Sequence, residues 1–408
     1  MSKWEWKKLG EVCEIARGGS PRPIKEYITS DADGINWIKI GDTDPTGKYI
    51  FSTEEKIKPS GIKKSRYVES GDFLLSNSMS FGRPYILKTN GCIHDGWLVL
   101  KNYQKYLDVN FFYHLLSSPI AQEQFDQEAK GSTVRNLNTD IVSKVYVPIP
   151  PLSEQKRIVK FLDEEFSKID TLKTNAETNL KNAKELFETT LEKELNPLSR
   201  HSERSEESSA ELPSGWEWKK IGDFCETSSG GTPLKQHNEY YENGNIPWLR
   251  SGEVCQKEIF ETEMCITQKG MENSSAKYFP ENSVVIAMYG ATAGQVGIVR
   301  FRTTTNQAVC GIFPNEKYIT EYLYYTLLSK KQELVAQAVG GAQPNISQIK
   351  IRSLVVPLPP LSVQKEIVAR LDKLSENVKR LEANYKQIIA NCDELKKSIL
   401  KKTFEGES

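Results

Sequence analysis

The sequence has little of what most often reveals a function. Its 408 residues include only four histidines and seven cysteines, and no two cysteines form a Cys-x-x-Cys pair. A zinc site is therefore not expected, and a reducing compartment such as the cytoplasm is. No run of eighteen apolar residues occurs and no apolar signal peptide is present, so we expect neither a membrane span nor secretion. Because 54 basic side chains balance 54 acidic ones, the net positive charge typical of nucleic-acid-binding proteins is absent as well.

What the sequence does contain is an internal repeat. The segment Trp4–Lys8 recurs unchanged as Trp216–Lys220, and Pro150–Asp163 closely matches Pro359–Asp372. A period of about 210 residues is too long for a solenoid, so the sequence predicts one domain unit that is used twice.

The first part of each unit is expected to be globular. Short β-branched and aromatic runs bounded by Gly, Asn and Pro predict mixed α and β structure in residues 1–152 and 212–361, with one helix in each, near 109–129 and 319–339. The clearest predicted strands are 35–40, 72–75, 97–100, 283–288 and 296–300.

The second part of each unit is expected to be one long helix. Ser153 and Ser362 are good N-cap residues directly after prolines, and they predict helices over 153–195 and 362–404. Apolar residues then recur at alternating spacings of three and four, which is typical of a coiled-coil seam. The predicted seam residues are Ile158, Leu162, Ile169, Leu172, Leu186, Ile367, Leu371, Leu374, Val378, Leu381, Ile388, Leu395 and Ile399.

The linker between the helices favours an antiparallel pair. Residues 196–211 include a Ser-, Glu- and Arg-rich stretch over 199–210, which indicates a flexible, solvated segment. Fully extended, the linker reaches about 53 Å, whereas each helix is about 60 Å long, so a parallel return is awkward. The predicted fold class is therefore α+β, with two mixed α/β globular domains separated by two long antiparallel helices and an internal pseudo-twofold repeat.

The sequence resembles the specificity subunit of a type I restriction–modification system. The resemblance covers essentially the whole chain and is carried most specifically by the two Pro-Pro-Leu-Ser-x-Gln-Lys helix starts. Further support comes from the Gly-Gly-Ser/Thr-Pro loops and the segments after the predicted globular helices, which are Gly18–Pro21, Gly230–Pro233, Gly131–Asn136 and Gly340–Asn345.

The resemblance implies a DNA-reading scaffold that is not itself an enzyme. Each globular part would be a target recognition domain for one half of a split DNA sequence, and the helices would act as a ruler and as the docking site for two modification subunits. Those partners would bind S-adenosylmethionine and methylate adenine, and a motor–endonuclease subunit using ATP and Mg would join for restriction and phage defence. The residues agree, because neither a P-loop nor the Asn-Pro-Pro-aromatic motif of adenine methyltransferases occurs.

Candidate DNA contacts are polar or basic side chains on loops, where they can reach base edges or phosphates. For each one taken alone, the alternative is an ordinary solvated side chain. The candidates in the first domain are Arg17, Arg22, Lys25, Lys63, Lys64, Arg66, Asn77, Arg83 and Arg135. Those in the second are Lys235, Gln236, His237, Arg250, Lys277, Gln295, Arg302, Gln343 and Asn345.

Several aromatic and cysteine positions are assigned a structural role instead. The paired tryptophans at alternate positions suit a strand with one ring packed inward, and Cys13 and Cys225 are expected in the core. Core packing is favoured over stacking beside a displaced base for four further rings, which are Tyr67, Phe81, Tyr278 and Tyr289.

The repeated scaffold carries different loops, and this predicts an asymmetric DNA target. His94-Asp95-Gly96 in the first copy corresponds to Asn306-Gln307-Ala308 in the second, and His94 could contribute to readout in one domain only. Two other functions remain open from the sequence: the DNA-specificity subunit of another defence machine or a combined restriction–modification enzyme, and a non-DNA scaffold with two ligand-binding domains. Since both globular parts are nearly neutral, we expect the chain alone to hold DNA weakly.

Overall fold

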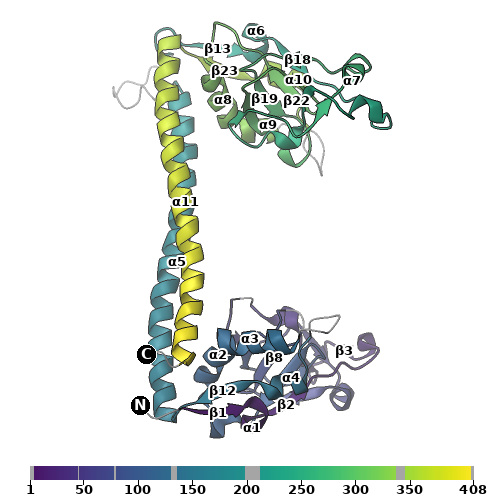
Figure 1. The fold of residues 1–408 in the computed structure, drawn as a ribbon, viewed down its shortest axis with the longest axis vertical. Coiled ribbons are helices and arrows are strands. Elements are labelled where there is room, and N and C mark those ends of the chain that lie inside the picture. The colour runs from purple at the N-terminus through teal and green to yellow at the C-terminus, as the bar shows by residue number, and fades with distance from the viewer. Residues whose placement is uncertain are drawn as a thin grey trace. The chain divides into compact units, whose positions relative to one another are not determined.

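The chain divides into two compact units that share the two long helices. The computed structural model describes residues 4–44, 46–77, 80–129, 136–197, 212–336 and 345–405. The first unit is Met1–Glu177 with Lys386–Ser408, and the second is Thr178–Tyr385. Each unit therefore combines one globular part with a portion of each long helix (Figure 1). In the described ranges, no helix combines the length and the apolar character needed to cross a bilayer.

The globular part of the first unit contains two five-stranded sheets and a two-stranded ribbon. The sheets have the orders β2-β11-β8-β9-β5 and β3-β6-β4-β10-β7, and the ribbon is β1-β12. The strands are β1 Glu5–Lys8, β2 Glu14–Arg17, β3 Ile28–Thr29, β4 Ile35–Ile38, β5 Tyr49–Ile50, β6 Glu55–Ile57, β7 Arg66–Val68, β8 Phe73–Ser76, β9 Pro84–Leu87, β10 Gly91–Ile93, β11 Trp97–Lys101 and β12 Tyr146–Ile149. The helices are α1 Leu9–Val12, α2 Val109–Ser117, α3 Pro119–Glu128 and α4 Thr139–Lys144, with 3-10 turns at Ile24–Glu26, Ile40–Asp42, Pro59–Lys64 and Tyr103–Lys105.

The second globular part repeats this architecture. Its five-stranded sheet has the order β14-β22-β19-β20-β16, its four-stranded sheet β17-β15-β21-β18, and its ribbon β13-β23. The strands are β13 Glu217–Lys220, β14 Thr227–Ser229, β15 Ile246–Leu249, β16 Glu258–Ile259, β17 Cys265–Ile266, β18 Tyr278–Phe279, β19 Val284–Ala287, β20 Val296–Val299, β21 Thr303–Thr305, β22 Val309–Ile312 and β23 Val355–Leu358. The helices are α6 Ile221–Phe224, α7 Gln268–Glu272, α8 Thr320–Ser329, α9 Lys331–Ala336 and α10 Gln348–Ser353, with 3-10 turns at Asn238–Tyr240, Ser251–Glu253 and Gly290–Thr292.

In each unit, the central strand of the sheet that packs against the helices, β8 or β19, is buried on both faces. In β8, Phe73 and Leu75 pack into the core beneath α2 and α3, whereas Leu74 packs into a second core between the two sheets. Successive side chains of a strand point to opposite faces, so a strand with a core on each side is apolar throughout. The same division occurs in β19, where Ile286 belongs to the helix-side core and Val285 to the inter-sheet core.

Two expectations for the helices of the globular parts need correction. The single helix predicted near 109–129 is two helices, α2 and α3, because Pro119 lacks the backbone N–H that would continue α2. The one predicted near 319–339 is likewise divided, with Lys330 between α8 and α9.

The two-stranded ribbons β1-β12 and β13-β23 confirm the structural role assigned to the repeated tryptophans. Trp216 is buried and Trp4 packs against the core, whereas Trp6 and Trp218 are about half exposed on β1 and β13. One ring of each pair therefore points inward, as the alternation predicts.

The long helices are α5 Leu152–Leu195 and α11 Leu361–Glu405, and each begins one residue before its predicted start. Within the first unit, Lys173 pairs with Asp393 at 2.7 Å and Asp170 pairs with Lys396. Rising numbers on one helix meet falling numbers on the other, so the helices are antiparallel there. The ion pair between Glu194 and Arg370, at 3.0 Å, fits an antiparallel pair in the second unit.

The predicted coiled-coil seam is only partly buried. Six of its members are buried, namely Ile158, Leu162, Ile169, Ile367, Leu371 and Val378. Leu374, Ile388 and Ile399 are partly buried. Four leucines assigned to the seam are instead 38–54% exposed, and these are Leu172, Leu186, Leu381 and Leu395. Ile169 and Val378 belong to one column of the heptad and the four exposed leucines to the other, so the contact between the helices is centred on the first column.

The glutamine of the repeated Pro-Pro-Leu-Ser-x-Gln-Lys motif fastens each long helix to its globular part. Gln155 is fully buried; its Oε1 accepts from the backbone N–H of Asp108 at 2.8 Å, and its Nε2 donates to the carbonyls of Tyr106 and Pro150 at 2.8 and 2.9 Å. All the partners are main-chain atoms that would otherwise be left unsatisfied.

The second copy repeats this arrangement. Gln364 accepts from the N–H of Ile319 at 2.8 Å and donates to the carbonyls of Pro359 and Lys317 at 2.9 and 3.3 Å. The motif is thus a structural clamp at the start of each helix.

Candidate nucleic-acid interface

The Gly-Gly-Ser-Pro loop of the first unit passes closely over the ends of two strands. The N–H of Gly18 donates to the carbonyl of Trp97 at 2.9 Å, and that of Gly19 donates to the carbonyl of Ile93 at 3.1 Å. A Cβ on Gly18 would lie 2.1 Å from the carbonyl oxygen of His94. The loop therefore requires glycine because the two backbones are in contact.

The equivalent loop of the second unit is built in the same way. Gly230 donates to Val309 at 3.3 Å and Gly231 donates to Thr305 at 2.9 Å, and a Cβ on Gly230 would lie 2.0 Å from the Thr305 oxygen. The Nε1 of Trp248 also donates to the Gly231 carbonyl at 3.0 Å. Both loops are thus held rigidly against the turn that follows β10 or β21.

Asp95 lies at the centre of the predicted DNA contacts of the first unit. Its Oδ1 accepts from the hydroxyl of Ser20 at 2.7 Å, and Arg22 lies 3.6 Å from its Oδ2. Its backbone carbonyl accepts from Nε of Arg17 at 3.1 Å and from Nδ2 of Asn77 at 2.7 Å. The hydrogen bond from Ser20 lowers the pKa of the Asp95 carboxyl, which is therefore ionised at neutral pH. Asp95 is not among the predicted contacts, although the difference between Asp95 and the corresponding Gln307 is a usable signal.

His94 fixes the orientation of this loop. The N–H of Gly96 donates to its Nδ1 at 2.6 Å, and the N–H of Ile40 lies 3.1 Å from its Nε2. Burial lowers the pKa of His94, so the ring is neutral at neutral pH. These contacts make His94 a support for Asp95 rather than a free side chain.

Other predicted basic residues surround the same loop. Nε of Arg66 donates to the carbonyl of Arg17 at 2.7 Å, and the Lys64 ammonium donates to the hydroxyl of Tyr27 at 2.6 Å. Lys25 and Lys63 are exposed on the neighbouring 3-10 turns. The loop borders a hollow of about 990 Å³ with an apolar lining. Its walls include Pro21, Pro23, Ile24, Trp37, Ile40 and His94.

Two predicted contacts of the first unit have other uses. Asn77 is buried, and its amide is occupied by the Asp95 carbonyl, so it positions the loop instead of reaching outward. Arg83 is partly buried against the ring of Tyr85 and lies 3.5 Å from the carbonyl of Gly47. Arg135, also predicted, lies outside the described residues.

The second unit places a hydroxyl and a carbonyl at the positions of Ser20 and Asp95. Thr232 donates its hydroxyl hydrogen to Oε1 of Gln307, so a carboxamide replaces the carboxylate. Lys235 and Gln236 are exposed just after this loop, and His237 stacks on Tyr240 with ring centroids 4.9 Å apart. These residues form a cluster equivalent to that of the first unit.

The remaining predicted contacts of the second unit are dispersed. Arg302 lies over the ring of Tyr278, 3.8 Å from its centroid. Lys277, which precedes Tyr278 in the chain, is exposed. Arg250 is paired with Glu253 and Glu263.

The last three predicted contacts of the second unit lie away from the glycine loop or outside the described residues. Gln295 lines a different hollow, with Phe187 and Val378, beside the long helices. Asn345 is exposed next to Tyr289, and Gln343 lies outside the described residues.

The expectation that four aromatic rings pack in the core is right for one of them. Phe81 packs against the helix-side core, whereas Tyr67, Tyr278 and Tyr289 are 36–40% exposed. Exposed rings beside basic side chains suit stacking or groove contacts better than core packing.

Two of the cysteines are buried in the core of the globular parts. Burial raises the pKa of the Cys13 and Cys225 thiols to about 12, which confirms their core assignment and makes them poor nucleophiles. No group of three metal-binding side chains occurs in the described ranges.

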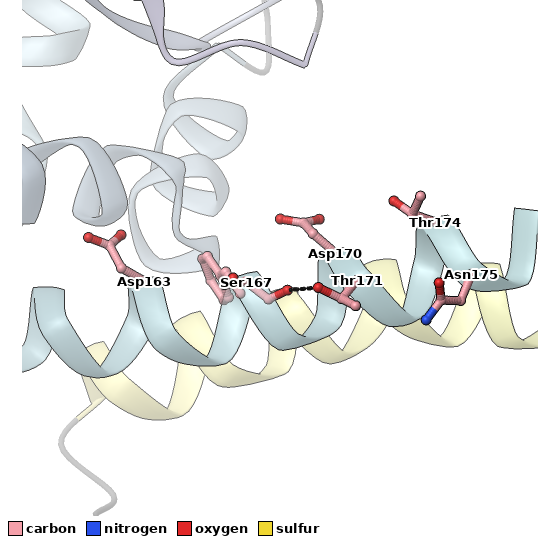
Figure 2. A pocket seen from close by; sticks show the side chains of 7 residues that line it. Asp163, Ser167, Asp170, Thr171, Thr174 and Asn175 are labelled. Atoms are coloured by element: carbon pink, nitrogen blue, oxygen red, sulfur yellow. Dashed lines mark hydrogen bonds between the residues drawn. The ribbon is translucent and has the colours of Figure 1, made fainter.

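A polar groove along α5 is also structural (Figure 2). Of its carboxylates, Asp163 is 3.0 Å from Nε2 of His114 and Asp170 is paired with Lys396, while Thr171 donates to the Ser167 carbonyl at 2.9 Å. These contacts use the groove's carboxylates to hold the first unit together.

The fold and these clusters define a tandem recognition protein. Two copies of one scaffold each present a rigid glycine loop with polar and basic side chains around it. Side chains of this kind can contact phosphates and base edges.

Comparison with known proteins identifies the family. The type I restriction modification DNA specificity domain matches residues 1–182 and 213–390. The specificity subunit of the type I restriction enzyme MjaIX of Methanocaldococcus jannaschii is 25% identical over 415 residues, covering 99% of this chain and 93% of that protein. That of EcoR124I/EcoR124II of Escherichia coli is 30% identical over 162 residues, 38% of this chain and 40% of that protein.

Solved structures agree on the fold. A chain from a study of complex assembly and conformational transition of the type I R-M system superimposes with a TM-score of 0.80, at 21% identity, over 99% of this chain and 98% of that one. The HsdS subunit from Thermoanaerobacter tengcongensis gives a TM-score of 0.62 at 21% identity over 100% and 98%. The chain belongs to the family of type I restriction–modification DNA specificity subunits, with two specificity domains in tandem. It is the DNA-recognition component of such a system and not an enzyme.

Proposed function

We propose that the chain reads a bipartite, asymmetric DNA target, one half-site with each globular part. The observation that carries this proposal is the pair Ser20–Asp95 and Thr232–Gln307, in which the same backbone presents a carboxylate in one unit and a carboxamide in the other. A carboxylate only accepts hydrogen bonds and suits the amino group of cytosine, whereas a carboxamide both donates and accepts and suits adenine. Two different half-sites require the same scaffold to present side chains that differ in their hydrogen-bonding groups.

The long helices are proposed to dock two modification subunits, one on each unit. The supporting observation is the set of half-exposed seam leucines. In the first unit, Leu172 and Leu395 lie at one level of the helix pair, because Lys173 is bonded to Asp393. Exposed leucines at a helix pair are suited to burial by a further helix.

The second unit has the equivalent pair. Leu186 precedes Phe187 and Leu381 precedes Glu382, and these neighbours line the same hollow. One partner for each unit would cover one pair of leucines.

The other components follow from this assignment. S-adenosylmethionine, ATP and Mg would be bound by the modification and motor–endonuclease subunits, with no cofactor in this chain and with the complex in the cytoplasm. Because basic and acidic side chains balance, the partners would supply much of the grip on the phosphates.

The decisive experiment is methylome sequencing of cells with and without the gene for this chain. We expect one split adenine-methylated motif to disappear with the gene. Persistence of every such motif would show that the chain does not direct methylation.

Docking is tested by replacing Leu172 and Leu395 with serine. We expect the purified complex to carry one modification subunit instead of two, measured by native mass spectrometry. Leu152→Ser, outside the two pairs, is the control. An unchanged stoichiometry would exclude the leucine pairs as the docking site.

A further inference from the structure

Each globular part exposes a phenylalanine at the same position of its fold. Phe51 directly follows β5 and Phe260 directly follows β16, and they are 70% and 68% exposed, the highest values for aromatic side chains in the described part of the chain. The preceding residues, Ile50 and Ile259, are almost fully buried. Single exposed apolar residues are common on proteins, but this pair of equivalent rings is the most exposed among the aromatic side chains of the described residues, which indicates a shared use.

The segments that carry these rings are fixed and not simply loose. In the first unit, the Asp42 carboxylate accepts from the N–H of Lys39 at 2.6 Å and from that of Glu54 at 3.1 Å. It therefore ties the residues after Phe51 to the 3-10 turn at Ile40–Asp42.

The second unit has the same tie. The Glu253 carboxylate accepts from the N–H of Arg250 at 3.1 Å and from that of Glu263 at 2.8 Å. Each phenylalanine is thus presented from an anchored loop, which lowers the entropy lost when a partner covers it.

The base of the second unit's loop lies against the long helix. Lys257, three residues before Phe260, is paired with Asp372 of α11, and the Tyr325 hydroxyl donates to the same carboxylate at 2.6 Å. The corresponding Lys48 of the first unit lies 4.8 Å over the ring of Tyr113, which is in α2. In the second unit, a surface that begins at α11 therefore continues onto the phenylalanine loop.

The charges around the rings disfavour DNA as the occupant. Phe51 is followed by the exposed Glu54 and Phe260 by the exposed Glu261, whereas Glu55, Glu258 and Glu263 are each paired with a basic side chain. Acidic side chains repel phosphates, whereas they complement a protein surface with an apolar pocket and a basic rim.

We propose that Phe51 and Phe260 are equivalent docking anchors, each inserted into an apolar, basic-rimmed pocket of one copy of the same protein. Because the anchor occurs once in each unit and adjoins a long helix in the second, that protein is the modification subunit, an assignment that rests on the proposed function. The anchor fastens the partner to the globular part, in addition to its contact with the helices.

The test measures binding of purified modification subunit to the full chain and to its variants by titration calorimetry. We expect Phe51→Ala and Phe260→Ala each to weaken one of two binding events by about tenfold or more, in line with the loss of a buried aromatic anchor. Phe51→Leu should retain part of the affinity. Ile349→Ala is the matched control, because Ile349 is 77% exposed and the corresponding residue of the first copy is Asp140.

The outcomes separate the two proposals. Wild-type chain that binds no modification subunit would overturn the proposed function. Wild-type binding with unchanged affinity of both alanine variants would overturn the anchors alone. Unchanged assembly combined with weaker DNA binding by the assembled complex would assign the rings to DNA and also overturn the inference.

Discussion

Ser20 donates a hydrogen bond to Oδ1 of Asp95 at 2.7 Å, and Thr232 makes the same bond to Gln307 in the second unit. A short hydroxyl side chain in each glycine loop thus orients one hydrogen-bonding group on the next turn. The hydroxyls are interchangeable, but the oriented groups differ in their ability to donate. This difference can change what each unit recognises without changing how it folds.

Asp95→Asn should alter the first half-site and leave the second unchanged. The amide still accepts from Ser20, but it gains a donor and loses the charge opposite Arg22. Because one base-pair contact is worth about 1–3 kcal/mol, discrimination at one position should fall roughly 5- to 150-fold. Methylome sequencing of cells carrying the variant measures this directly, and Gln307→Glu is the reciprocal variant. If both variants direct methylation of the same motif as the wild-type chain, these residues do not take part in readout.

Gly18→Ala should impair recognition by the first unit. The new Cβ would lie 2.1 Å from the His94 carbonyl oxygen, so the loop that carries Ser20 must move. Gly41→Ala is the control, since a Cβ at Gly41 meets no other atom within 4 Å. DNA binding by the assembled complex, measured on targets altered in one half-site at a time, should show a loss confined to the first half. Equal behaviour of the two variants would mean that the close approach is unimportant.

Gln155→Ala should destabilise the first unit by about 2–4 kcal/mol. The substitution leaves the N–H of Asp108 and the carbonyls of Tyr106 and Pro150 buried without this partner. Urea unfolding, followed by tryptophan fluorescence, gives the change in the free energy of unfolding. Gln127→Ala, at an exposed position of α3, should have almost no effect. A loss below about 0.5 kcal/mol would contradict the clamp.

Acid should destabilise the first unit through His114. This side chain is buried, and burial lowers its pKa although Asp163 opposes the shift. The unfolded chain therefore binds the proton more readily, so this contribution to stability is complete above the ordinary pKa of 6.5 and is lost as the pH falls below it. His114→Tyr, which introduces the residue that the second copy has at the equivalent Tyr325, should reduce the difference between the urea midpoints at about pH 7.5 and about pH 5.5. Equal differences in the two proteins would show that His114 does not titrate on unfolding.

The features that depend on local pattern are predictable from the sequence. Trp4–Lys8 and its copy reveal the duplication, and the heptads reveal α5 and α11 almost to the residue. The break at Pro119 is equally local, because the missing N–H ends α2, yet the apolar pattern across it favours one continuous helix.

The features that depend on distant partners are not predictable. The exposure of Leu172 follows from which heptad column faces the partner helix, and the heptad alone does not encode this. Asp95 is not an obvious DNA contact because it is acidic, and only the fold brings Ser20, Arg17 and Arg22 to it. Asn77 shows the opposite error, because its amide suits base readout but is buried.

The glutamine clamp has a consequence for how specificity can evolve. Gln155 and Gln364 bond only to main-chain atoms of the globular parts, so the joint is indifferent to which side chains those parts carry. Recombination at this joint would exchange one globular part for another with a different DNA target, while the connection to the long helix stays intact. A new specificity can therefore arise by exchange of a globular part, without changes in the long helices or in their attachment to it.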